Sequence, residues 1–198
     1  MIANHIHDAL AQVRKLQEFI LEKKKFQGYS GVARMTGGFG ALAGTIVLAS
    51  DIVPKSPVPQ LIGWCAILVI ALASNYCALA LWFFFDKEAR RELLRLMPAF
   101  DAVPALAVGA VLSLAVILQE QYQFLFGIWM CLYGLVHVVY RLSLPKANYA
   151  VGIFYMLSGA WCLLDPRILF INPWPMGIVF FVGESVGGFI LYRNREEG

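Results

Sequence analysis

The sequence predicts an all-α, polytopic membrane protein with six transmembrane helices and with both termini in the cytoplasm. Three observations lead to this prediction: an apolar composition, six separate apolar runs and an uneven distribution of Lys and Arg. Hydrophobic residues make up 60% of the 198 residues and charged residues 15%, whereas soluble domains average about 45–50% and 25%. A soluble domain of this length cannot bury so much apolar surface, but a bilayer can cover it.

The six apolar runs are separated by charged residues, prolines and polar loop residues. A transmembrane helix needs roughly 17–25 residues; the runs are close to this length, and the second exceeds it. Backbone polar groups find no partners in lipid, so such runs are expected to be helical. The runs are Val32–Ser50, Val58–Phe85, Ala102–Gln119, Gln123–Tyr140, Tyr149–Leu164 and Pro173–Tyr192.

Lys and Arg lie almost entirely on one side of these predicted helices. Of the 16 such residues, 14 fall on the side that carries the N-terminus, and only Lys55 and Arg167 fall on the other. Arg34, at the start of the first run, is counted among the 14. Cytoplasmic loops are enriched in Lys and Arg, so the N-terminus is predicted to be cytoplasmic, and six helices return the C-terminus to that side. We expect a multi-pass protein of a bacterial inner membrane.

The chain is predicted to have three parts. Residues 1–30 form a cytoplasmic amphipathic helix, in which apolar residues recur every three to four positions. Residues 31–193 form the six-helix membrane domain, and residues 194–198 a short cytoplasmic tail. The cluster Lys23, Lys24 and Lys25 is expected to contact anionic lipid, where each cation gains about 1 kcal/mol. No secretory signal peptide is recognised in the polar first segment.

A weak internal similarity suggests that the membrane domain consists of three consecutive helical hairpins. In the first hairpin, Asp51 is followed by the motif Pro57-x-Pro59, and in the last hairpin Asp165 is followed by Pro173-x-Pro175. The middle hairpin matches this pattern poorly. Three helix pairs around a pseudo-axis are therefore an expectation that rests on two of the pairs.

Glu184 is the most informative single residue. It lies about halfway along the last apolar run, which places it near the bilayer midplane. A carboxylate there is costly and usually faces the bundle interior or a water-filled cavity. Desolvation favours the neutral acid unless a cation lies near. Two interpretations stay open: a site that binds a ligand or proton, and a protonated acid that only hydrogen-bonds a neighbouring helix.

Two further polar residues are candidates for the same internal site. Asn75 lies at a depth comparable to that of Glu184, as do Thr45, Ser113 and Ser158. Because an Asn in lipid needs an interhelical partner, we expect Asn75 to pair with Glu184. His137 lies about 6 Å inside the cytoplasmic boundary and is a candidate to accept a proton from Glu184. The alternative for His137 is a neutral hydrogen-bonding role.

Small residues at four-residue spacing predict close helix packing. The motifs are Gly40-x-x-x-Gly44 in the first run, Gly109 within a small-residue series in the third run, and Gly183-x-x-x-Gly187 around Glu184. Each of these five glycines is expected to let a neighbouring helix approach.

The remaining sequence features argue against enzymatic and metal-binding functions. The four cysteines lie in apolar runs without metal-ligand spacing, and the sequence lacks GxSxG, HExxH and Walker motifs. We therefore expect neither an enzyme nor a metal site, and no cofactor is identified. Expected partners are the bilayer and either a second copy or another membrane protein, but not nucleic acid. Two functions stay open: handling of a small solute or proton around Glu184, and a structural or regulatory subunit that docks through its helices and N-terminal segment.

Overall fold

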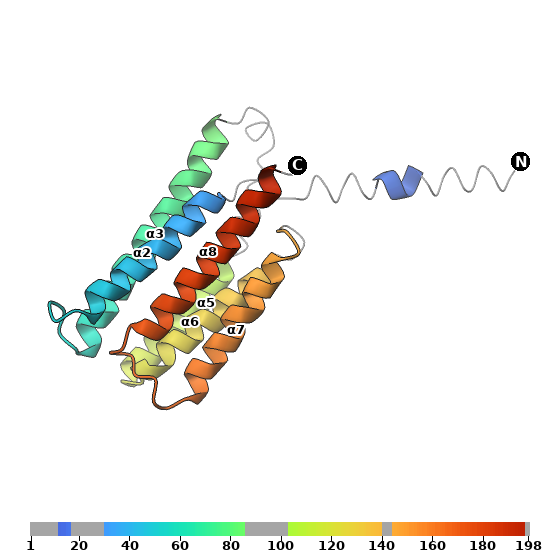
Figure 1. Cartoon of the computed structure of the whole chain (residues 1–198). Coiled ribbons are helices and arrows are strands. Elements are labelled where there is room, and N and C mark those ends of the chain that lie inside the picture. The colour runs from blue at the N-terminus through green and yellow to red at the C-terminus, as the bar shows by residue number, and fades with distance from the viewer. Residues whose placement is uncertain (1–11, 17–29, 86–102, 140–143, 197–198) are drawn as a thin grey trace, which may run out of the picture.

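The computed structural model describes residues 12–16, 30–85, 103–139 and 144–196. Within these ranges the chain forms helices and no strand, so the all-α class is confirmed. The long helices are α2 (Gly31–Ala49), α3 (Pro57–Phe85), α5 (Val103–Leu118), α6 (Leu125–Val139), α7 (Asn148–Leu164) and α8 (Trp174–Glu196); the short 3-10 helix η3 (Tyr122–Phe124) precedes α6 (Figure 1).

All six predicted apolar runs are helical, and most of their ends lie within two residues of the predicted positions. Four helical segments are long and apolar enough to cross a membrane: α2, α3, α8 and the continuous stretch Tyr122–Val139. Helices α5 and α7 are apolar but shorter, with 16 and 17 residues. Of the predicted N-terminal helix, residues 12–16 are helical. Its remainder, including Lys23, Lys24 and Lys25, lies outside the described residues.

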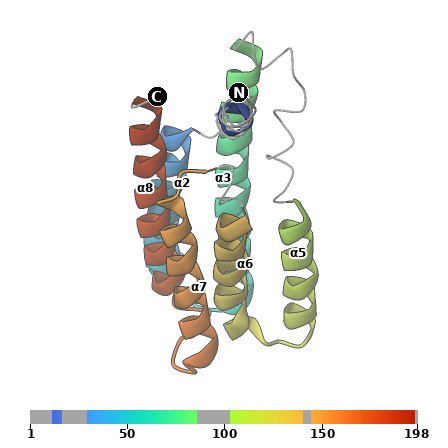
Figure 2. The same ribbon diagram turned by 90° about the vertical axis from the view of Figure 1, so that its right-hand side faces the viewer.

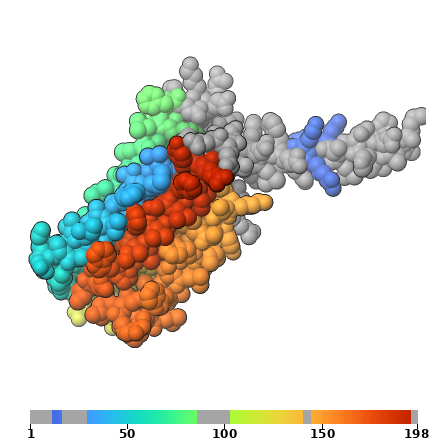
Figure 3. All heavy atoms as spheres, in the orientation of Figure 1, coloured from blue at the N-terminus to red at the C-terminus, as the bar shows by residue number. Residues whose placement is uncertain are grey.

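The closest packing joins helices that belong to different predicted hairpins. Helix α2 packs antiparallel against α8, and α6 packs antiparallel against α7. These two pairs meet through α7 and α8, while α3 lies against α2 and α5 against α6 (Figure 2). Figure 3 shows α2, α8 and α7 side by side on one face of the molecule. The two helices of each predicted hairpin are in contact, but the closest packing lies between helices of different hairpins.

Each close pair depends on glycines that meet backbone to backbone. A Cβ at Gly31 would lie 2.5 Å from the Gly188 carbonyl oxygen, and one at Gly188 would lie 2.6 Å from that of Gly31. In the other pair, a Cβ at Gly134 would lie 2.6 Å from the Gly152 oxygen and one at Gly127 would lie 2.7 Å from the Gly159 oxygen. No side chain fits at such distances, so these glycines set the helix separation.

The predicted packing glycines have mixed outcomes. Gly40 is exposed and has nothing within 4 Å of its Cβ position, so it does not pack against another of the described helices of this chain. Gly44 contacts Ile67 of α3, and Gly109 contacts Trp129 and Leu132 of α6. These two glycines do pack against neighbours, but the neighbours are side chains and not backbone.

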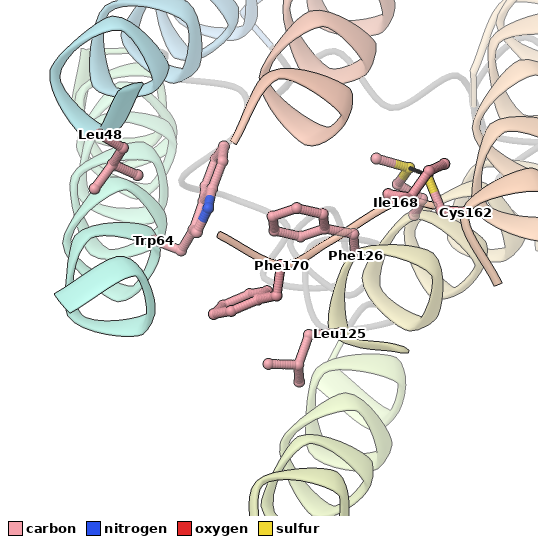
Figure 4. Close-up of a cluster of buried hydrophobic side chains, with 8 residues drawn as sticks. Leu48, Trp64, Leu125, Phe126, Cys162, Ile168 and Phe170 are labelled. Atoms are coloured by element: carbon pink, nitrogen blue, oxygen red, sulfur yellow. Dashed lines mark hydrogen bonds between the residues drawn. The ribbon is translucent and has the colours of Figure 1, made fainter. Parts of the chain in front are cut away.

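A cluster of buried apolar side chains lies at the end of the bundle where α2 ends and α6 begins (Figure 4). The ring of Phe126 lies 5.7 Å from that of Trp64 and 5.0 Å from that of Phe170, measured between centroids. The cluster links α2, α3, α6, α7 and the loop between α7 and α8. Its members are Leu48, Trp64, Leu125, Phe126, Met130, Cys162, Ile168 and Phe170.

Candidate functional site

The centre of the site is an ion pair between Arg34 of α2 and Glu184 of α8. Arg34 Nε donates to Glu184 Oε2 at 3.0 Å, and Arg34 Nη2 donates to Oε1 at 3.1 Å. Both side chains are only 8% exposed. Arg34 is counted above among the cations of the cytoplasmic surface. The structure corrects this assignment, because Arg34 faces inward from the first turn of its helix and holds α2 and α8 together.

Two tyrosines complete the hydrogen bonding of the carboxylate. Tyr133 of α6 and Tyr155 of α7 donate their hydroxyl protons to Glu184 Oε1 at 3.0 and 2.9 Å. With the two bonds from Arg34, the carboxylate accepts four hydrogen bonds from three other helices. In all four bonds the partner donates, which matches the ionised form of Glu184. A neutral Glu184 was expected only if no cation lay near it, and Arg34 is such a cation.

His137 contributes to the site in a defined tautomer. Its Nδ1 lies 2.8 Å from the Tyr133 carbonyl oxygen, which only accepts, so Nδ1 carries the proton. Its Nε2 contacts Arg34 Nη2, which only donates, so Nε2 accepts and the ring is neutral. His137 is therefore next to the site, as predicted. In this arrangement, however, the Nε2 lone pair accepts from Arg34 and does not face Glu184.

Asn148, the first residue of α7, binds the remaining edge of the guanidinium. Arg34 Nη1 donates to Asn148 Oδ1 at 2.9 Å. Asn148 is 1% exposed, and its Nδ2 has no hydrogen-bond partner. Arg34 and Asn148 lie in the first turns of α2 and α7, and His137 lies in the last turn of α6. The site is therefore close to the end of the bundle at which α2 and α7 begin.

Glycines create the space that these side chains fill. A Cβ at Gly187 would lie 2.7 Å from Arg34 Nη1, and a Cβ at Gly183 would lie 2.6 Å from Tyr155 Cε2. On α2, a Cβ at Gly38 would lie 2.9 Å from the Cβ of Glu184. The spacing of Gly183-x-x-x-Gly187 predicted that two helix backbones meet at this motif. In the structure, the two glycines face side chains instead. They make room on both sides of Glu184 for the two groups that bind it.

Aromatic rings surround the ion pair on its apolar side. The rings of Tyr133, Tyr155 and Phe180 lie 5.0–5.3 Å apart between centroids. Tyr155 is completely buried. Such a wall excludes water, which strengthens the attraction between the charges and raises the cost of leaving either charge alone.

Asn75 does not belong to the site. Its Nδ2 donates to the Ala71 carbonyl oxygen, 2.9 Å away on the same helix, so the predicted contact with Glu184 is wrong. Helix α3 packs mainly on α2 and does not approach α8 closely. Thr45 and Ser113 likewise donate to carbonyl oxygens one turn earlier on their own helices. The expected layer of polar side chains is therefore not a connected network.

Glu184 and His137 were predicted from the sequence as site residues, whereas the other four members of the site were not: Arg34, Tyr133, Asn148 and Tyr155. The buried positions of α2 and α7 recur at a heptad-like spacing, and this spacing could have identified Arg34 and Asn148. The buried residues of α2 are Gly31, Arg34, Gly38, Ala41, Thr45 and Leu48. Steps of three and four residues recur in α7, where Asn148, Tyr155 and the packing glycines share one face. A search for polar residues in register with glycines would have selected Arg34 and Asn148.

Among the residues that the structure describes, no group of three or more His, Cys, Asp or Glu side chains is arranged to hold a metal ion. Comparisons with protein-family models, with curated proteins and with solved structures give no significant match. Any functional conclusion therefore rests on the geometry of the site.

Proposed function

We propose that this chain is an integral membrane protein that binds, senses or transports a small solute or a proton at the buried site around Arg34 and Glu184. The observation that carries the proposal is the number of helices joined by one carboxylate. Glu184 of α8 is bonded to Arg34 of α2, Tyr133 of α6 and Tyr155 of α7. A proton or competing ligand at Glu184 changes contacts with three helices at once, which couples a chemical event to helix arrangement.

Energetic considerations support a functional role for the pair. Removing two charges from water costs several kcal/mol per ion, and apolar residues of similar volume often stabilise a protein equally well. Ionisable residues inside membrane proteins are rare and are concentrated at ligand sites and proton pathways. An ion pair used only for stability is therefore the less economical explanation.

For the topology we propose six membrane-spanning helices with both termini in the cytoplasm of a bacterial cell, in its inner membrane. The apolar character of the shorter helices α5 and α7 supports this number. Arg34 is buried and no longer counts as a surface cation, but the other basic residues keep their strong bias toward one side. The site then lies in the cytoplasmic half of the membrane domain.

A second candidate function is that of a structural or regulatory subunit, and one observation favours it. Only Gln60 and Trp64 are buried among the 29 residues of α3. The rest of this helix presents apolar side chains to lipid, to a second copy or to another membrane protein. In this case the Arg34–Glu184 pair only orders the inner helices and binds nothing.

Native mass spectrometry of the full chain, extracted with its surrounding lipid, distinguishes the two functions. We expect a reproducible small-molecule adduct that is lost in the double variant Arg34→Gln/Glu184→Gln. This variant removes both charges together and leaves no unpaired ion, so it is the matched test of the site. Asn75→Ala on α3 is the control and should retain the adduct. A stoichiometric protein partner without any adduct would support the subunit function instead.

A further inference from the structure

The side chain of Asn148 holds an unused donor in a fixed position. Its Oδ1 accepts from Arg34 Nη1, and because a guanidinium only donates, the amide cannot be reversed. Nδ2 is consequently fixed as well, and it has no partner although Asn148 is 1% exposed. Buried donors without an acceptor are uncommon in native proteins. An acceptor oxygen on a bound molecule would satisfy this donor.

Arg34 offers a second donor beside the first. A guanidinium has five N–H bonds. Nε binds Glu184, the two protons of Nη2 serve Glu184 and His137, and one proton of Nη1 serves Asn148. One N–H of Nη1 is left, on the atom that already contacts Asn148. Two free donors on adjacent side chains match the two oxygens of a carboxylate.

The charges of the site restrict how such an anion can bind. Four elements face it: α2 contributes Arg34, α6 contributes the neutral Tyr133 and His137, α7 contributes Tyr155 and Asn148, and α8 contributes Glu184. Arg34 and Glu184 balance each other, so the site is neutral. An added anion would leave one uncompensated negative charge among aromatic rings, which is very unfavourable. A proton taken up by Glu184 restores neutrality.

We propose that the site binds a small carboxylate together with one proton, the carboxylate at Arg34 and Asn148 and the proton on Glu184. The proton comes from water and forms an O–H bond on a Glu184 oxygen, and no other covalent bond changes. The neutral acid stays beside Tyr133 and Tyr155, while the ligand replaces it as the counter-ion of Arg34. This inference rests on the proposed function and names its substrate class.

The test compares two probes of the same shape, acetate and acetamide, with the full chain in lipid nanodiscs. Affinity is measured by saturation-transfer NMR on the probe methyl group, between about pH 6 and pH 8, where acetate stays ionised. Uptake of one proton predicts that acetate binds about tenfold more weakly for each unit of rising pH. Neutral acetamide should bind more weakly than acetate at pH 6 and without pH dependence.

Two variants locate the groups. Glu184→Gln imitates the protonated acid, so acetate should bind it with no pH dependence. Asn148→Asp keeps an acceptor for Arg34 but replaces the free donor with a negatively charged oxygen, so its acetate affinity should fall at least tenfold. Size-exclusion profiles show whether each variant is folded, and Asn75→Ala serves as the control outside the site. If Glu184→Gln does not fold, the pH dependence of the wild type and the loss in Asn148→Asp still test the proposal.

Three outcomes would overturn the inference. Acetate binding that does not change with pH, but is lost in Arg34→Gln/Glu184→Gln, would contradict proton coupling and leave the proposed function intact. A pH dependence that persists in Glu184→Gln and disappears in His137→Gln would place the proton on His137. Binding of neither probe would exclude a small carboxylate, and the proposed function would then depend on the adduct test alone.

Discussion

The four inner helices and the two outer helices differ in what covers their surfaces. In α6, six of 15 residues are buried, and in α7 six of 17. In α3, two of 29 residues are buried, and in α5 only Gly109. The inner helices α2, α6, α7 and α8 bury glycines and charged side chains against one another. The outer helices are apolar almost all round, which is typical of surfaces that face lipid or a partner.

The difference shows that the buried ion pair and its hydrogen-bond partners all lie on the inner helices. The outer helices α3 and α5 contribute no side chain to the Arg34–Glu184 network. The helices that form it owe their close packing to glycines. Substitutions of inner residues should therefore have large effects and comparable substitutions on the outer helices small ones.

The largest effect is expected from breaking the ion pair on one side only. Arg34→Met leaves the Glu184 carboxylate buried without its cation, which should lower the free energy of unfolding by about 3–5 kcal/mol. The double variant Arg34→Met/Glu184→Leu should recover much of this loss because no charge stays unpaired. The measurement is reversible unfolding in mixed detergent. Equal losses in the single and double variants would show that the two charges are not coupled.

A smaller effect is expected at the glycine contacts of the inner helices. Gly134→Ala places a methyl group against the Gly152 carbonyl and should cost about 1–3 kcal/mol through overpacking. Gly40→Ala is the matched control on α2, since nothing lies within 4 Å of its Cβ position. It should stabilise the protein by up to about 1 kcal/mol through helix propensity. Similar changes at both positions would mean that α6 and α7 are less closely packed than the structure shows.

Asn75 of the outer helix α3 should tolerate substitution. Its side chain bonds only its own helix, so Asn75→Ala should change the free energy of unfolding by no more than about 0.5 kcal/mol. The same unfolding assay measures this change. A loss of several kcal/mol would show that Asn75 has an interhelical partner, as the sequence first suggested.

The smallest effect is expected in the loop after α7. Hydrogen bonds from Arg167 lower the pKa of Asp165 from its usual 3.8 to about 2. Because the folded-state pKa is the lower one, the stabilisation is fully present above pH 3.8 and is lost as the pH falls toward 2. Arg167 is 86% exposed, so solvent screens the interaction. In Asp165→Asn, the melting temperature should therefore fall slightly less steeply as the pH is lowered from about 4 to 2. A steeper fall than in the wild type would contradict this assignment.

The positions of the helices were predictable because each is bounded by local signals. Charged residues and prolines interrupt the apolar runs, and helices are the only structure that satisfies the backbone within each run. Glu184 was predictable for a similar reason, since a lone carboxylate in an apolar helix is unusual by itself.

The partners of Glu184 were not predictable in the same way, because depth along a helix does not specify rotation or neighbours. Asn75 has a suitable depth but lies on α3, which packs mainly on α2. Arg34 is the actual partner, and its place at the start of α2 made it resemble a surface cation. The heptad-like register of Arg34 with Gly31 and Gly38 is the feature that distinguishes a buried arginine from a surface one.

Infrared difference spectroscopy of the wild type against Glu184→Gln tests most directly the proposal that Arg34 holds Glu184 as a carboxylate ready to accept a proton. At neutral pH we predict that the variant loses a carboxylate stretching band, and that adding acetate to the wild type converts this band to that of a protonated acid. Loss of a protonated-acid band in the absence of any ligand would contradict the proposal, since Glu184 would then be neutral beside Arg34.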